Sequence, residues 1–251
     1  LLAEGIISLF MFSLYCIMVA GAGSILQESF SIPHIYSVTM MSLLCMAILF
    51  FGIDGVTAVS SVLTPLMVIG IAAIGLYIML TRDLSVFNAA QGMRTVTRNW
   101  FFSSLLYVGY NSILGVVVLC GMGPYLCTRR TGTAGAVLGG MVLCAIALIL
   151  NVIMAVLYPQ SMSSEIPILD IVSRYHSLLN CFYSFVLWTA MLLSATASGY
   201  GVLERIEKRV RIKRRSAAFM LSVLSIPLSQ LGFSHLISML YPLFGYAGMV
   251  M

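Results

Sequence analysis

The sequence predicts an all-α membrane protein whose helices form two related groups in opposite orientations. Two observations predict the class: hydrophobic residues make up 61% of the 251 positions, and charged residues make up only 8%. A soluble domain of this length does not need so much apolar surface. A third observation, a pattern of residues that recurs late in the chain, predicts how the helices are arranged.

Apolar runs separated by short polar connections define the expected helices. A helix that crosses the bilayer needs about 20 apolar residues, and we expect membrane helices over residues 5–27, 34–53, 56–80, 100–123, 133–157, 177–203, 217–233 and 235–251. Gly135 and Gly139 give the fifth helix a face of small residues that favours close helix contact. Two connections, over 85–98 and 163–172, are each long enough for a short surface helix.

The basic residues predict the orientation of the chain. Seven of the thirteen Lys and Arg residues lie between Arg205 and Arg215, which places the loop over 204–216 in the cytoplasm. A polybasic segment that binds lipid is compatible with the same location. Alternation then places Arg129 and Arg130 inside as well, so that nine basic residues lie inside and four outside. Because the charge is clustered in loops, it does not indicate a nucleic-acid partner.

A repeated motif relates the first part of the chain to the last. The segment Ser61-Val62-Leu63-Thr64-Pro65-Leu66 recurs as Ser238-Met239-Leu240-Tyr241-Pro242-Leu243, and a glycine precedes each copy, at Gly52 and Gly232. The first three helices therefore resemble the sixth, seventh and eighth. The copies are five helices apart, which is an odd number, so they lie in opposite orientations, as in many secondary transporters.

The repeat defines the expected organisation of the chain. Residues 1–81 would hold the last three helices of the first repeat, residues 82–99 an extracellular connection, and residues 100–251 the five helices of the second repeat. By the same logic, two further helices, or about 80 residues with about 20 per span, are expected before the first residue.

Polar residues inside the fourth apolar run indicate a binding site. In hydrocarbon an unpaired polar group costs several kcal/mol, so these residues must face a protein interior or a cavity. A polar membrane helix that opens at a glycine, here Gly109, is typical of a transporter's substrate site. The alternative is that the hydroxyl groups bond back to carbonyls of their own helix, which is common for serine in membrane helices.

The segment Leu105-Leu106-Tyr107-Val108-Gly109-Tyr110-Asn111, the Pro-Leu ends of the repeats and the order of the loops resemble the YkvI-type family of bacterial membrane transporters. This family is grouped with the amino acid–polyamine–organocation superfamily, and the resemblance covers essentially the whole chain. It implies a LeuT-like five-plus-five inverted-repeat bundle in the bacterial cytoplasmic membrane, with this chain supplying helices three to ten. It also implies alternating access around a site halfway through the membrane, driven by sodium or protons.

The resemblance also implies residues that bind the solute. The fourth run matches the broken sixth helix of the fold, and Tyr15 matches the aromatic residue on the third helix that often caps the substrate. The substrate-binding residues implied in this way are Tyr15, Ser104, Tyr107, Gly109, Tyr110 and Asn111.

Residues for a sodium ion are implied in the same way. The eighth helix of the fold often binds sodium through a serine/threonine pair, and the implied residues here are Ser194, Thr196 and Ser198, together with Asn151 on the seventh helix. Ala195 follows Ser194, which departs from the family's pattern. The structural alternatives are a hydrogen bond between helices for Asn151 and a packing seam of small residues for the other three.

The remaining observations separate the function classes. No acidic residue lies in the middle of an apolar run, which favours sodium over protons as the coupling ion. The sequence has no HExxH, GxSxG or paired intramembrane acids, so we expect no enzyme and no cofactor other than a sodium ion. The function predicted is secondary active transport of a small, amino-acid-like solute. The alternative is a receptor or assembly subunit with a transporter fold, like spore-germination permeases, that binds without flux.

Overall fold

The computed structural model describes residues 2–81, 99–121, 128–157, 177–210 and 212–250, together with Ile166 and Leu169. The described part of the chain contains the eight helices α1 (Leu2–Phe30), α2 (His34–Phe50), α3 (Gly52–Thr81), α4 (Trp100–Gly121), α5 (Arg129–Leu157), α7 (Ser177–Val210), α8 (Arg214–Ser229) and α9 (Phe233–Val250). This confirms the all-helical prediction and its eight helices. The surface helices predicted over 85–98 and 163–172 lie outside the described residues, apart from Ile166 and Leu169.

The helices differ in whether they can cross a membrane. By length and composition α1, α3, α5 and α7 can each do so, and α8 with α9 would make a fifth span that is bent by 108°. Among the described residues, the prediction of eight separate membrane segments is therefore confirmed as eight helices but only as four or five candidate spans. Of α4, only Trp100–Gly109 enters this count. For α8 the reason is length: its 16 residues extend about 24 Å at 1.5 Å per residue, which is less than the roughly 30 Å of hydrocarbon.

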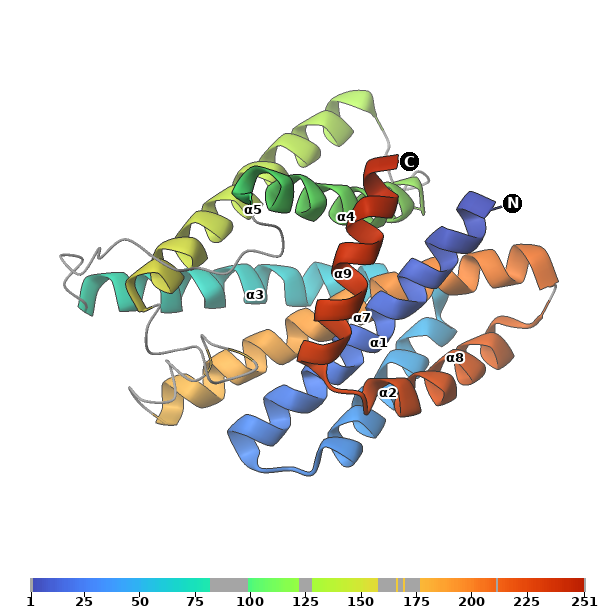
Figure 1. Cartoon of the computed structure of the whole chain (residues 1–251), viewed down its shortest axis with the longest axis horizontal. Coiled ribbons are helices and arrows are strands. Elements are labelled where there is room, and N and C mark those ends of the chain that lie inside the picture. The colour runs from blue at the N-terminus through green and yellow to red at the C-terminus, as the bar shows by residue number, and fades with distance from the viewer. Residues whose placement is uncertain are drawn as a thin grey trace.

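The centre of the molecule is the pairing of α1 with α7 (Figure 1). Near the end of α1, the Ser29 hydroxyl lies 2.6 Å from that of Ser184, near the start of α7. In the middle of α1, Tyr15 packs on Gly199, which lies farther along α7. Contact positions rise along one helix as they fall along the other, so the two helices are antiparallel.

Helices α2 and α8 also pack in an antiparallel arrangement. The start of α2 meets the end of α8, where His34 Nδ1 lies 3.4 Å from Gln230 Oε1. At the middle, Ser42 donates a hydrogen bond of 2.9 Å to the carbonyl of Ser222. The start of α8, at Arg214, contacts Gly52 just after the end of α2. The α2–α3 and α7–α8 connections therefore share one face of the bundle, and the α1–α2 and α8–α9 connections share the opposite face. The alternation of inside and outside connections, which we derived from the basic residues, groups these four connections in the same way.

Two glycines make the corners of the bundle. Gly52 has φ of 66° and Gly232 has φ of 90°, a region that glycine adopts without the steric cost of a Cβ. At Gly52 the space for a Cβ is occupied by the guanidinium of Arg214. That guanidinium is fixed by two hydrogen bonds of 2.8 and 2.7 Å to Glu207, and it lies 5.8 Å from the centre of the Tyr200 ring.

The predicted contact through Gly135 and Gly139 is not formed within the described residues. A Cβ at either glycine would meet nothing within 4 Å. Helix α5 packs chiefly on α3 (Figure 1) and exposes most of its side chains. Its small-residue face is therefore open.

We expect Gly52→Ala to destabilise the protein. A non-glycine residue in the left-handed region costs roughly 1–2 kcal/mol, and the new methyl group would also displace Arg214. The measurement is the midpoint of thermal unfolding in detergent. The control is Gly140→Ala, where a Cβ meets nothing within 4 Å and alanine favours the helix. Equal midpoints for the two variants would contradict this account of the corner.

The paired connections predict which sites react with a membrane-impermeant maleimide. In a cysteine-free background, Ile32→Cys should be labelled in intact cells. Leu231→Cys should be labelled as well if α8 and α9 cross separately, and should not be labelled if they form one bent span. Phe51→Cys and Lys213→Cys should be labelled only after permeabilisation, because the loop over 204–216 is predicted to be cytoplasmic. Opposite accessibility of the Phe51 and Lys213 positions would show that the two connections do not share a face.

Candidate functional site

A cavity of about 370 Å³ lies between α4 and α9. It combines an apolar wall with four hydroxyl groups, and its lining residues are Ser103, Leu106, Tyr107, Ile237, Ser238, Tyr241 and Pro242. It joins the polar stretch of α4 to the second copy of the repeated motif. A concave, mostly apolar pocket with a few converging polar groups is the usual form of a small-molecule site.

Close packing on both sides of α9 fixes the position of this cavity. On one side, a Cβ at Gly245 would lie only 2.9 Å from Leu106 Cδ2 and 3.3 Å from the Leu106 carbonyl oxygen, so α9 packs closely on α4 and a larger residue here would force Leu106 to move. On the other side, the Phe244 ring lies 4.7 Å from the Phe10 ring of α1. The cavity opens about one turn before this contact, at Tyr241 and Pro242.

Helix α4 does not open at Gly109. It is a continuous α-helix over Trp100–Gly121, so the prediction of a broken helix at this glycine is wrong. The reason is that the polar side chains bond back to their own helix: Ser104 donates to the Trp100 carbonyl at 3.0 Å, and Asn111 donates to the Tyr107 carbonyl at 2.8 Å. This is the alternative for polar residues in a membrane helix.

The predicted residues of α4 have different environments. Tyr107 lines the cavity with 61% of its side chain exposed. Gly109 is buried, whereas Ser104 and Asn111 are exposed. Tyr110 belongs to α4, but its side chain lies outside the part that the structure describes. Of the five residues, the cavity lining therefore includes Tyr107.

Three hydroxyl residues of the cavity were not predicted as site residues. Ser238 and Tyr241 belong to the repeated motif, which predicted topology and not a site. Ser103 is the first residue of the polar stretch of α4, which runs from Ser103 to Gly115. The signal that could have found them was the polar character of the motif itself.

Tyr15 lies in a different place. It is fully buried, and its hydroxyl is 3.3 Å from that of Ser222. Ser42 and Ser225 continue this cluster, with their hydroxyl oxygens 3.3 Å apart. Tyr15 is not among the residues that line the α4–α9 cavity, so the structure does not bring it together with Tyr107.

The predicted sodium ligands do not form one group either. Asn151 is exposed on α5 and donates to the Ala147 carbonyl at 2.8 Å. Thr196 and Ser198 are buried on α7 and donate to carbonyls of their own helix, Thr196 to Leu192 at 2.9 Å and Ser198 to Ser194 at 2.8 Å. Ser194 is half-buried.

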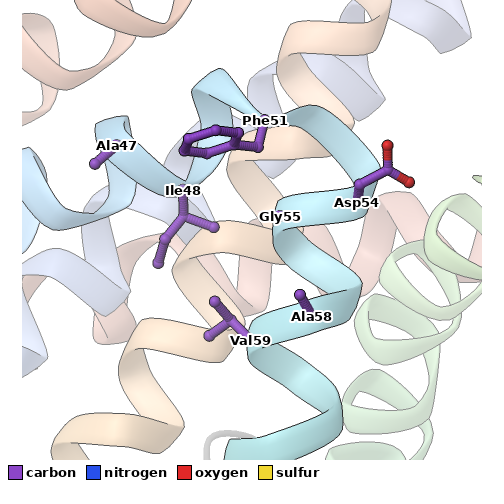
Figure 2. A pocket seen from close by; sticks show the side chains of 7 residues that line it. All are labelled: Ala47, Ile48, Phe51, Asp54, Gly55, Ala58 and Val59. Carbon is purple, nitrogen blue, oxygen red and sulfur yellow. The ribbon is translucent and has the colours of Figure 1, made fainter.

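Two other cavities offer less chemistry. One, of about 440 Å³, lies at the α2–α3 corner and is apolar except for Asp54. Figure 2 shows the Asp54 carboxylate directed away from Ile48 and Phe51. The other, of about 570 Å³, is lined by hydrophobic side chains of α1, α7, α8 and the connection between α7 and α8. Neither provides several converging polar groups.

We expect Tyr15→Phe to lower stability without changing solute binding. The change removes the hydroxyl that meets Ser222, and a buried hydrogen bond contributes about 0.5–1.5 kcal/mol. Thermal unfolding and ligand titration of the same preparation measure the two effects. A weaker affinity at unchanged stability would instead favour the substrate-capping role that the resemblance implies.

Comparison with known proteins shows that the chain is similar, at low sequence identity, to two bacterial proteins. No protein-family model and no solved structure matches it. It is similar to the "Uncharacterized membrane protein YkvI" of Bacillus subtilis (strain 168), with 23% identity over 237 residues, which is 93% of this chain and 66% of YkvI. It is also similar to the "Uncharacterized protein YyaD" of the same organism, with 23% identity over 240 residues, which is 96% of this chain and 69% of YyaD. The chain thus spans about two thirds of the length of these relatives, and it is a multi-pass membrane protein distantly homologous to YkvI over nearly its full length.

Proposed function

We propose that this protein is a secondary active transporter that moves a small organic solute across the bacterial cytoplasmic membrane by alternating access. The observation that carries the proposal is the α4–α9 cavity. It brings a tyrosine from the polar stretch of α4 against a tyrosine and a serine from the repeated motif of α9. The wall has apolar area for burial and hydroxyl groups for orientation, as solute sites do.

The pairing of equivalent helices supports an inverted repeat. If α1, α2 and α3 correspond to α7, α8 and α9, the two central pairs each join a helix to its own counterpart. Both pairs are antiparallel, as the contacts of Ser29 with Ser184 and of His34 with Gln230 indicate. The corner at Gly52 then lies on the opposite face from the corner at Gly232, so α3 and α9 begin on opposite faces. This is the relation that an inverted-topology repeat requires.

Local details of the two copies also correspond. Each has a left-handed glycine, Gly52 or Gly232, before a helix that contains a proline. In each copy, the serine four residues before the proline donates its hydroxyl hydrogen bond to the carbonyl three residues earlier in the helix. Ser61 donates to the Ala58 carbonyl at 2.8 Å, and Ser238 donates to the His235 carbonyl at 2.9 Å.

The distribution of acids favours sodium as the coupling ion. Proton-coupled transporters use carboxylates inside the membrane, but the acidic residues of this sequence lie near helix ends or in connections. Solute movement with the sodium gradient needs no such group. We also propose that the protein has no enzymatic activity, because the residues that line the cavity include no carboxylate, histidine, lysine or cysteine.

We expect Tyr107→Leu and Tyr241→Leu each to lower solute uptake about tenfold or more, since the loss of an aromatic contact and a hydroxyl costs about 1.4 kcal/mol or more of binding. The measurement is uptake of labelled amino acids and amines into proteoliposomes with an inward sodium gradient. The matched control is Tyr36→Leu, because Tyr36 is similarly exposed, at 69% against 61% for Tyr107, but lies on α2.

Three outcomes separate the functions. Uptake that collapses with the sodium gradient and depends on the two cavity tyrosines supports transport. Saturable binding without accumulation of any solute favours the receptor with a transporter fold. Uptake that is insensitive to both cavity tyrosines would remove the α4–α9 cavity from the solute path.

A further inference from the structure

Three helical prolines leave backbone carbonyls without their usual donors. Because proline has no N–H, the carbonyl four residues before it cannot form the normal helical hydrogen bond. Prolines lie inside α3, α8 and α9, at Pro65, Pro227 and Pro242. The carbonyls concerned are those of Ser61, Val223 and Ser238.

Among these carbonyls, only that of Ser238 belongs to a pair, Ser238 and Pro242, of which both residues line the polar cavity. A helical carbonyl points along the axis toward the residue four positions later, so this oxygen lies between Ser238 and Pro242, and both residues line the α4–α9 cavity. The cavity lined by Val223 and Pro227 has no hydroxyl-bearing side chain. Ser61 and Pro65 are exposed on α3 and line none of the three cavities described above.

The groups around this oxygen favour a cation that donates hydrogen bonds. The Ser238 hydroxyl gives its proton to the His235 carbonyl, so its oxygen presents lone pairs to the cavity. Tyr107 and Tyr241 add two aromatic rings, whose faces attract cations. No lining residue carries a charged or N–H-bearing side chain that would hold a carboxylate. Acceptor oxygens and aromatic faces suit an ammonium group, which has three donors and no acceptor.

We propose that the Ser238 carbonyl, exposed by Pro242 and flanked by Tyr107 and Tyr241, binds the primary ammonium group of the solute. This inference rests on the proposed function in one respect: it takes the α4–α9 cavity as the solute site. The amino-acid-like solute predicted from the sequence would carry such an amine, and the inference adds that the backbone of α9 recognises it.

The test restores the missing donor. Pro242→Ala returns an N–H that can bond to the Ser238 carbonyl, and alanine favours the helix, so the variant should fold. Pro65→Ala is the matched control, because it makes the same change in the other copy of the motif, away from the cavity. The probes are butylammonium and 2-phenylethylammonium, each compared with the alcohol of the same carbon skeleton. Affinity is measured by calorimetric titration of the purified protein in detergent.

We expect each amine to bind at least about tenfold more tightly than its alcohol, as hydrogen bonds to charged groups predict, in the wild type and in Pro65→Ala. Pro242→Ala should abolish this preference, and Tyr107→Leu, which leaves the carbonyl open, should reduce it. Equal affinity for amines and alcohols, or an unchanged preference in Pro242→Ala, would overturn the proposal.

Two further measurements identify the occupant and separate the proposals. If sodium alone, compared with potassium, binds in a manner that Pro242→Ala abolishes, the oxygen belongs to a sodium site and the ammonium proposal fails. If amines bind with the expected preference but do not accumulate in proteoliposomes, the transport function fails and the ammonium site stands. If solutes accumulate in proteoliposomes but amines bind no more tightly than alcohols, the ammonium proposal fails and the transport function stands.

Discussion

The structure depends on the requirement that polar groups in a bilayer find partners inside the protein. In hydrocarbon no water can satisfy an N–H, a carbonyl or a hydroxyl. Ser104, Asn111 and Thr196 meet this requirement within their own helices. Other hydroxyl groups bond between helices, such as that of Ser229, which donates to the Cys16 carbonyl at 2.9 Å. Packing of α1 with α7 and of α2 with α8 supplies the rest of the cohesion, because lipid provides little hydrophobic force between helices.

Backbone groups that are free to bind a ligand are therefore expected where a helix is interrupted. The corner at Gly52 is closed by the Arg214–Glu207 ion pair, and the corner at Gly232 lies beside the contact of His34 with Gln230. These corners complete the bundle. The proline of α9 differs from them, because its cavity also holds hydroxyl groups of α4. The proposed inverted repeat would allow such a difference, since two equivalent helices would meet different neighbours.

Much of the fold could be predicted from the sequence, because apolar runs, glycines and charge bias are local signals. Most helix bounds follow from them to within a few residues, and so does the turn at Gly52. The corner at Gly232 does not, because the predicted helix over 217–233 includes it, whereas α8 ends at Ser229 and α9 begins at Phe233. Of the residues that line the α4–α9 cavity, only Tyr107 could be predicted as a site residue, because the partner of a polar side chain depends on which helix packs beside it. Tyr15 is an aromatic residue of the type that caps a substrate, but its hydroxyl meets the serine cluster of α2 and α8 and it does not line the α4–α9 cavity. The span count could not be predicted either, since an apolar run of 16 residues does not reveal a bend of 108°.

The contrast between Gly109 and Pro242 is the reason that we assign the open backbone carbonyl to α9 and not to α4. Glycine makes a helix easier to break by only about 1 kcal/mol, and it keeps its N–H, so in lipid the closed helix still wins. Proline removes the donor by its covalent structure, and no rearrangement of α9 can give it back. A sequence search for a transporter's exposed carbonyls should therefore weight a proline inside an apolar helix above a glycine, and should look four residues before it. Here that position is Ser238, on the wall of the cavity that Tyr107 also lines.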